Sequence, residues 1–107
     1  MYSWTTPTNT FQTNIDLTQA RVYLTYARNG RVLLEFTNER LIITEDSVTV
    51  KLTQADTAKL WSRSNSPVEI QIRYVTEDGI ADASNIMEAT VERVLKDGEI
   101  QYVPSEI

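Results

Sequence analysis

Apolar and polar residues alternate along most of this sequence in runs of five to nine residues. The clearest run is 68–76, in which Ile70, Ile72 and Tyr74 share one face and charged or amide residues share the other. A repeat of two residues is the period of a β-strand with one buried face. The alternation therefore predicts that short strands, each with one apolar face, make up most of the fold.

The first predicted hairpin joins residues 20–27 to residues 32–36. The Asn-Gly pair between them is typical of a two-residue turn. That turn would set Leu24 opposite a glutamate, because every second residue faces the same way. A three-residue loop over 28–30 pairs Leu24 with Leu34 and keeps one apolar face, so we expect the longer loop.

The second predicted hairpin has a four-residue loop over 44–47. This loop length keeps Leu41 and Ile43 on the same inward face as the apolar residues that follow, Val48, Val50 and Leu52. Ile42 is then left on the outer face.

A short helix is predicted over residues 53–61, where the strand pattern stops. Thr53 stands as the N-cap and Asp56, three residues later, completes the pattern of a capping box. The apolar residues Ala55, Leu60 and Trp61 are expected to close one end of the core.

A turn at 77–79 is expected to return the chain through residues 80–93, with Met87, Ala89 and Val91 facing inward. The alternation fails around Ser84 and Asn85, where we expect a bulge or an irregular crossing. Further strands are predicted over residues 8–15, which include Phe11, and over 99–103.

These elements predict an all-β fold, an antiparallel sandwich of seven to eight strands with one short helix at about 53–61. The length of 107 residues fits a single domain over 1–107. Residues 1–6 and 104–107 are expected to be flexible tails.

Composition excludes several classes of function. The chain has no His and no Cys, so disulfides, thiolate chemistry and His-based proton transfer are ruled out. The net charge of −5 does not suit the phosphate backbone of a nucleic acid. No apolar run approaches the roughly 20 residues of a membrane helix, and the first residues do not have the charged-then-apolar pattern of a leader, so we expect no secretory signal. We therefore expect no enzyme activity, no cofactor, and no nucleic-acid or membrane partner.

Metal binding has one candidate group, the carboxylates of Glu77, Asp78 and Asp82 around one turn. Their spacing is not that of an EF-hand. Carboxylates at a hairpin tip are usually solvated turn residues, so we expect no metal site.

Two groups of residues are candidate interfaces. Tyr23, Leu33 and Ile42 all fall on predicted outer faces and would together form an exposed apolar patch. Tyr2 and Trp4 lie in the terminal segment, which is either frayed or docked on a partner. Trp61 is more typical of a core residue, since it ends an apolar turn.

Three stretches of the sequence carry a resemblance to a known family. The first joins residues 7–11 to 16–20, the second is 48–57, and the third runs from 68–74 through Asp-Gly at 78–79 to Ala-Ser-Asn-Ile at 83–86. Together they resemble small proteins encoded among the tail and structural genes of phages and prophages of Firmicutes. More distantly, they resemble the immunoglobulin-like amino-terminal domain of phage upper baseplate proteins.

The resemblance implies an immunoglobulin-like sandwich and a structural or assembly role in a phage tail or baseplate, without catalytic residues. Its expected partners are other phage structural proteins or further copies of the chain, assembled in the bacterial host cytoplasm and then held in the virion. The alternative is a carbohydrate-binding module that recognises host-surface sugars through an exposed Trp61 or Tyr74.

Overall fold

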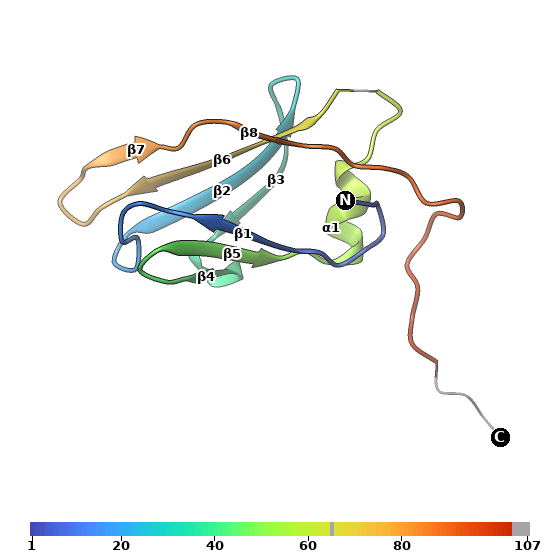
Figure 1. Cartoon of the computed structure of the whole chain (residues 1–107), viewed down its shortest axis with the longest axis horizontal. Coiled ribbons are helices and arrows are strands. Elements are labelled where there is room, and N and C mark those ends of the chain that lie inside the picture. Colours follow the sequence, from blue (N-terminus) through green and yellow to red (C-terminus); the bar gives the residue numbers. More distant parts are fainter. Residues whose placement is uncertain (65, 104–107) are drawn as a thin grey trace.

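Two antiparallel β-sheets build the protein (Figure 1), as the alternation predicts. The structure is a computed structural model that describes residues 1–64 and 66–103. In this part of the chain the first sheet has the order β1-β5-β4, and the second has the order β3-β2-β6-β7 with β8 also pairing with β6. The elements are β1 (Thr8–Gln12), β2 (Arg21–Arg28), β3 (Arg31–Thr37), the 3-10 helix η1 (Asn38–Arg40), β4 (Leu41–Ile43), β5 (Ser47–Lys51), α1 (Gln54–Leu60), β6 (Val68–Val75), β7 (Ala81–Ala83) and β8 (Met87–Ala89).

The apolar faces of the two sheets form one core. Each strand buries every second side chain, so the alternation in the sequence becomes the inner face of a sheet. The all-β, sandwich-like fold expected from the sequence is confirmed. The buried apolar residues are Leu17, Ala20, Val22, Leu24, Tyr26, Leu34, Phe36, Leu41, Val48, Val50, Leu52, Leu60, Val68, Ile70 and Ile72.

The loop predicted for the first hairpin is wrong. Arg28 pairs with Arg31 across a two-residue turn, and both turn residues have positive φ, 51° at Asn29 and 79° at Gly30. The register then shifts between Tyr26 and Ala27. Leu24 consequently faces Phe36, not Leu34 as the three-residue loop required.

A β-bulge in β3 makes the two-residue turn compatible with an apolar inner face on both strands. Ala27 pairs with Val32 and Tyr26 pairs with Leu34, so Leu33 is an extra residue in β3. The extra residue moves the rest of β3 by one position, which returns Leu34 and Phe36 to the core. The Asn-Gly turn and an unbroken apolar face therefore coexist.

The second hairpin has the predicted register. Ile43 pairs with Val48 across residues 44–47, and Leu41 pairs with Val50. Ile42 is 66% exposed on the outer face, as expected.

Helix α1 begins after Thr53 with the predicted capping box. The Asp56 N–H donates to the Thr53 hydroxyl, and the Thr53 N–H donates to the Asp56 carboxylate. Leu60 is buried as predicted, but Ala55 is exposed and Trp61 is only partly buried. Asp56 and Thr57 occupy the inner face instead, because hydrogen bonds hold both side chains there.

The return from β6 is split into β7 and β8 by residues 84–86, which confirms the irregularity predicted there. Met87, Ala89 and Val91 pack against the core as expected. The strand predicted over 99–103 is not formed.

Of the two segments expected to be flexible tails, the structure describes only residues 1–6. The segment 1–6 makes hydrogen bonds with residues 90–92 and with Thr57, so contacts hold it in place where a flexible tail was expected. The predicted tail 104–107 lies outside the described residues.

Candidate interaction cleft

A cleft of about 870 Å³ opens between β1 of the first sheet and the β7–β8 segment of the second. It is larger than a second hollow of about 410 Å³ beside Asp16 and Asp78. Apolar residues of both sheets form much of its surface, and amide, hydroxyl and carboxylate groups add polar ones. Its lining residues are Thr10, Phe11, Gln12, Thr13, Asn14, Ile15, Leu17, Ile72, Tyr74, Asp82, Ala83, Ser84, Asn85 and Met87.

Ser84 marks the break in the second sheet beside this cleft. The Ile72 N–H donates to the Ser84 hydroxyl at 3.0 Å, while the Ser84 N–H donates to the Ile72 carbonyl at 2.8 Å. A side-chain oxygen thus takes the place of a strand carbonyl. The Gln71 side-chain amide also donates to the Ser84 carbonyl, so hydrogen bonds with both Gln71 and Ile72 hold the break in place. β7 therefore stops and β8 resumes only at Met87.

The backbone of β1 forms the opposite wall and presents a free strand edge. The Leu52 N–H donates to the Pro7 carbonyl and the Thr13 N–H donates to the Asp46 carbonyl. In an antiparallel ladder, the odd-numbered residues of β1 therefore point their peptide groups at β5. The peptide groups of Thr8, Thr10 and Gln12 point away from β5, and no strand pairs with them in the described part of the chain.

The β1 edge differs from the other sheet edges in its charge. Natural edge strands are commonly short or carry charged side chains, which prevents pairing with other chains. Among the described edges, β3 carries Arg31 and Glu35, β8 carries Glu88, and β4 and β7 have three residues each. β1 has five residues and no charge. It is therefore the edge best suited to accept a further strand.

The polar groups of the cleft are mostly uncharged. Gln12 and Asn14 contribute amides from the β1 side, and Asn85 contributes one from the β7–β8 side. Asp82 is the one carboxylate in the lining, and one of its oxygens already accepts the Ala83 N–H. The cleft can therefore bind an uncharged chain or ligand through amides and backbone groups, with Tyr74 as an aromatic contact.

The predicted patch of Tyr23, Leu33 and Ile42 is not formed. Tyr23 lies on the outer face of β2, and Ile42 lies on the outer face of β4 in the other sheet, so the two point to opposite sides of the molecule. Leu33 is the bulge residue and packs against the core. The predicted patch assumed a β3 without a bulge, in which Leu33 would lie on the face opposite Leu34 and Phe36.

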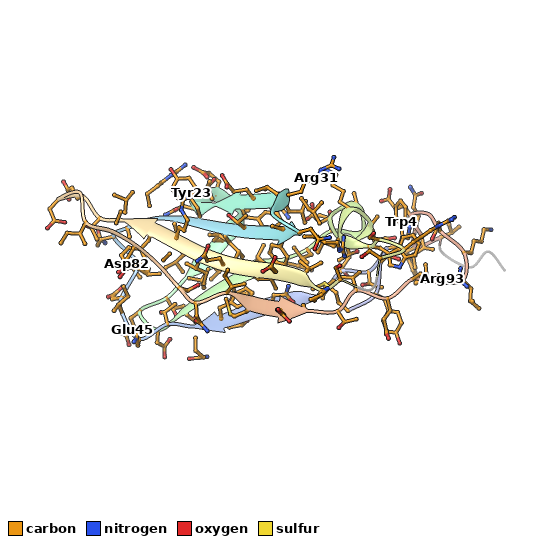
Figure 2. The ribbon with its side chains drawn as sticks, turned by 90° about the horizontal axis from the view of Figure 1, so that it is seen from above. Trp4, Tyr23, Arg31, Glu45, Asp82 and Arg93 are labelled. Atoms are coloured by element: carbon orange, nitrogen blue, oxygen red, sulfur yellow. The ribbon has the colours of Figure 1, made fainter. Side chains whose placement is uncertain are left out.

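The segment 1–6 docks on its own chain, and Figure 2 shows Trp4 at the α1 end of the molecule. Tyr2 forms a parallel bridge with Glu92 and is 53% exposed. Trp4 is partly buried. It is the last residue of the turn before Thr5 and has a positive φ of 58°. Hydrogen bonds within the chain hold this segment, so the expectation of fraying is wrong, and docking of Tyr2 and Trp4 on a partner stays a prediction.

The carboxylates considered for a metal do not form a ligand set. Within residues 1–64 and 66–103, no three His, Cys, Asp or Glu side chains gather closely enough to hold an ion. A smaller hollow of about 410 Å³ includes Asp16, Glu77 and Asp78, but Asp16 and Asp78 accept hydrogen bonds from Thr18 and Thr76. In the described part of the chain, no helix has the length and apolar character to cross a membrane.

The cleft residues were missed from sequence because they come from distant parts of the chain. The uncharged edge strand at residues 8–12 is visible in the sequence, and so is the irregularity at Ser84. That the two lie on the same side of the sandwich follows only from the sheet order. Comparison with protein-family models, curated proteins and solved structures finds no match to this chain.

Proposed function

We propose that this chain is a non-enzymatic structural or assembly protein of a phage or prophage tail or baseplate. It acts through protein–protein contacts at the cleft beside β1. The uncharged, unpaired edge of β1 carries the proposal, because such an edge favours pairing with another chain. The phage assignment and the immunoglobulin-like relationship rest on the resemblance of residues 48–57 and the stretches around them.

The chemistry of the cleft favours a contact surface over a catalytic site. General acid–base catalysis needs a side chain that is positioned to transfer a proton to or from the reacting group. Asp82 is the one carboxylate among the lining residues, and the hydroxyl of Ser84 accepts the Ile72 N–H and donates to the Asn85 carbonyl. These groups are suited to binding through hydrogen bonds and burial of apolar surface.

The test of this function is the composition of assembled particles. Particles purified from an induced lysogen that carries the coding sequence are digested and quantified by mass spectrometry against major tail proteins. We expect a fixed number of copies per particle, with the chain assembled in the host cytoplasm before release. Absence of the chain from intact particles, together with its presence in the cell lysate, would contradict the proposal.

Sugar binding is the second candidate, and Tyr74 is the observation that favours it. Aromatic rings and side-chain amides are the groups that commonly contact sugars, and Tyr74 shares the cleft with Gln12, Asn14 and Asn85. Trp61, the other expected sugar contact, is not among the lining residues. Because Trp4 lies at the far end of the molecule from Asp82 (Figure 2), tryptophan fluorescence is a poor reporter of this cleft.

Amide shift mapping by NMR with cell-wall oligosaccharides tests the sugar candidate directly. Binding predicts shifts confined to β1 and residues 82–87, lost in Tyr74→Ala and kept in Tyr23→Ala. Unchanged spectra across a broad set of glycans would exclude this function.

A further inference from the structure

Residues 99–103 have the composition of a strand but lie outside both sheets. Ile100 is 75% exposed, Tyr102 is 90% exposed and Val103 is 78% exposed. Ile, Tyr and Val are among the residues that favour strands. Three large apolar side chains within four residues are therefore left in solvent at the end of the described chain.

The start of this segment is held by Gln54 of α1. The Gln54 side-chain amide donates to the Ile100 carbonyl at 2.7 Å and accepts the Ile100 N–H at 2.8 Å. This pair of hydrogen bonds is like that of one residue in an antiparallel ladder. It fixes the backbone of Ile100 against α1, at the point where the segment leaves the molecule.

The segment and the cleft lie at opposite ends of the molecule. In Figure 1 the chain after β8 passes α1 and leaves the body beside it, whereas β7 lies at the other end. In Figure 2 Asp82 of the cleft and Arg93 are likewise at opposite ends. Residues 100–103 therefore cannot reach the cleft of their own molecule, but they can reach the cleft of another molecule.

We propose that residues 100–103 of one copy add as a strand to the free edge of β1 in a second copy. Ile100 and Tyr102 share one face of such a strand and enter the cleft, while Gln101 and Val103 face outward. This inference rests on the proposed function, since it names a second copy as the partner of the cleft.

Composition supports this pairing of segment and edge. Both the segment Ile-Gln-Tyr-Val and the β1 sequence Thr-Asn-Thr-Phe-Gln are uncharged, so pairing the two strands places no charged side chain between them. The peptide groups of Thr8, Thr10 and Gln12 supply the hydrogen bonds, and the apolar residues Phe11, Ile72 and Met87 receive the side chains.

Because the donor and the acceptor are different surfaces at opposite ends, the contact is heterologous. Each copy that accepts a strand still offers its own, so growth does not stop at a dimer. The expected products are head-to-tail chains or closed rings, as an assembly component requires.

The first experiment measures the docking itself. A protein that ends at Glu99 is titrated into a fluorescent peptide of residues 96–107, and the anisotropy is recorded. We expect saturable binding at a single class of sites. Tyr102→Asp in the peptide should weaken binding at least tenfold, and Gln101→Asp, its matched control on the outward face, should change it less than threefold.

A second pair of variants tests the edge of β1. Thr10→Pro removes an N–H that points away from β5, so it blocks the added strand without removing a hydrogen bond of the β1–β5 ladder. Thr10→Ala is the control, because both variants lose the hydroxyl contact with Thr49 but only the proline loses the edge N–H. We expect at least tenfold weaker peptide binding for Thr10→Pro and wild-type binding for Thr10→Ala, both with native circular dichroism.

The full chain provides the complementary measurement by light scattering over a concentration series. Its weight-average mass should rise above 12.2 kDa with concentration and pass the value of a dimer, whereas the protein ending at Glu99 stays monomeric. Absence of peptide binding at millimolar concentration, or equal loss with Tyr102→Asp and Gln101→Asp, would overturn the inference. If the chain is present in particles but shows no such binding, the proposed function stands and the second copy is the wrong partner.

Discussion

Asp56 shows how one buried polar residue joins the start of α1 to the end of η1. It is 9% exposed, and its carboxylate accepts hydrogen bonds from the Thr53 N–H and from the Arg40 guanidinium, each at 2.9 Å. Burial raises the pKa of the Asp56 carboxyl, but these hydrogen bonds outweigh it and hold the pKa below its usual value. The same group thus caps α1 and fixes the end of η1.

We expect Asp56→Asn to lower the free energy of unfolding by about 1 kcal/mol at pH 7, the usual cost of a lost helix cap. A carboxyl with a lowered folded-state pKa stabilises the protein above the unfolded-state pKa of about 3.9, and this stability is lost as the pH falls through the folded-state value. The difference between wild type and Asp56→Asn should therefore shrink between pH 5 and pH 2, roughly the range spanned by such shifts. Urea unfolding at several pH values measures it, with the exposed Asp97→Asn as the control; an equal cost at all pH values would contradict the assignment.

Tyr26 joins the two sheets at a single residue. Its ring is buried and packs edge-on against Phe36, with ring centroids 5.9 Å apart. Its hydroxyl accepts a hydrogen bond of 2.6 Å from the Asn9 amide, which belongs to β1 of the other sheet. Burial raises the pKa of the Tyr26 hydroxyl, so the folded protein favours the neutral form of this side chain.

Tyr26→Phe should therefore cost about 1 kcal/mol at pH 7, the usual net value of one hydrogen bond. Because the folded-state pKa is raised, this residue's pH-dependent stabilisation is full below about pH 10 and is lost as the pH rises through the folded-state value. Tyr26→Phe should thus be less sensitive than wild type to a change from pH 9 to pH 11, with Tyr23→Phe on the outer face as the control. Guanidinium unfolding at both pH values measures this; identical alkaline loss in wild type and Tyr26→Phe would show that another group is responsible.

Among the elements, the two hairpins show what the sequence can and cannot predict. The β4–β5 hairpin has a regular ladder, so counting residues by parity predicts its register. The β2–β3 hairpin contains a bulge at Leu33, and a bulge changes the count by one without any mark in the residue types. Parity therefore assigned the correct inner face to Leu34 and Phe36 but the wrong turn and the wrong partners.

We expect Gly30→Ala to destabilise the protein by about 1–2 kcal/mol, because Gly30 has a φ of 79° and an L-residue with a side chain is strained there. Space is not the limitation, since no atom lies within 4 Å of an added Cβ. Asn29→Gly keeps a residue that tolerates positive φ and should change stability by less than about 0.5 kcal/mol. Thermal unfolding of both variants measures the difference; a neutral Gly30→Ala would contradict the positive φ at this position.

The cleft is an example of a site that element-level prediction cannot assemble. Residues 8–15 and the break at Ser84 were each predicted, but their meeting depends on the order β1-β5-β4 facing β3-β2-β6-β7. Residues 99–103 were predicted as a strand from composition, yet they have no partner strand in the described part of the chain. Composition predicts the tendency to pair, whereas only the tertiary arrangement supplies the partner.

On the scale of the whole molecule, the extents of 57 × 37 × 17 Å describe a long, thin body with two unlike ends. The α1 end is closed by the amino-terminal segment. The Glu92 N–H donates to the Met1 carbonyl, and the Ser3 N–H donates to the Glu92 carbonyl, both at 2.8 Å. Ser3 is 2% exposed, and Thr5 exchanges two hydrogen bonds with Thr57 of α1.

This arrangement makes the amino-terminal segment the support for the path that the chain takes towards Ile100. In a protein that begins at Pro7, the Glu92 N–H loses its acceptor, and the Thr57 hydroxyl loses both of its hydrogen bonds with Thr5 but keeps the one to the Gln54 carbonyl. We expect the Glu92 amide to exchange with solvent at least tenfold faster, while amides in β2 and β6 keep their protection because those strands pair with each other. Hydrogen exchange read by NMR distinguishes this local opening from global unfolding, in which β2 and β6 would exchange faster as well. Unchanged protection at Glu92 would show that the bridge to residues 1–3 does not hold this end, and that the position of the segment after it depends on Gln54 alone.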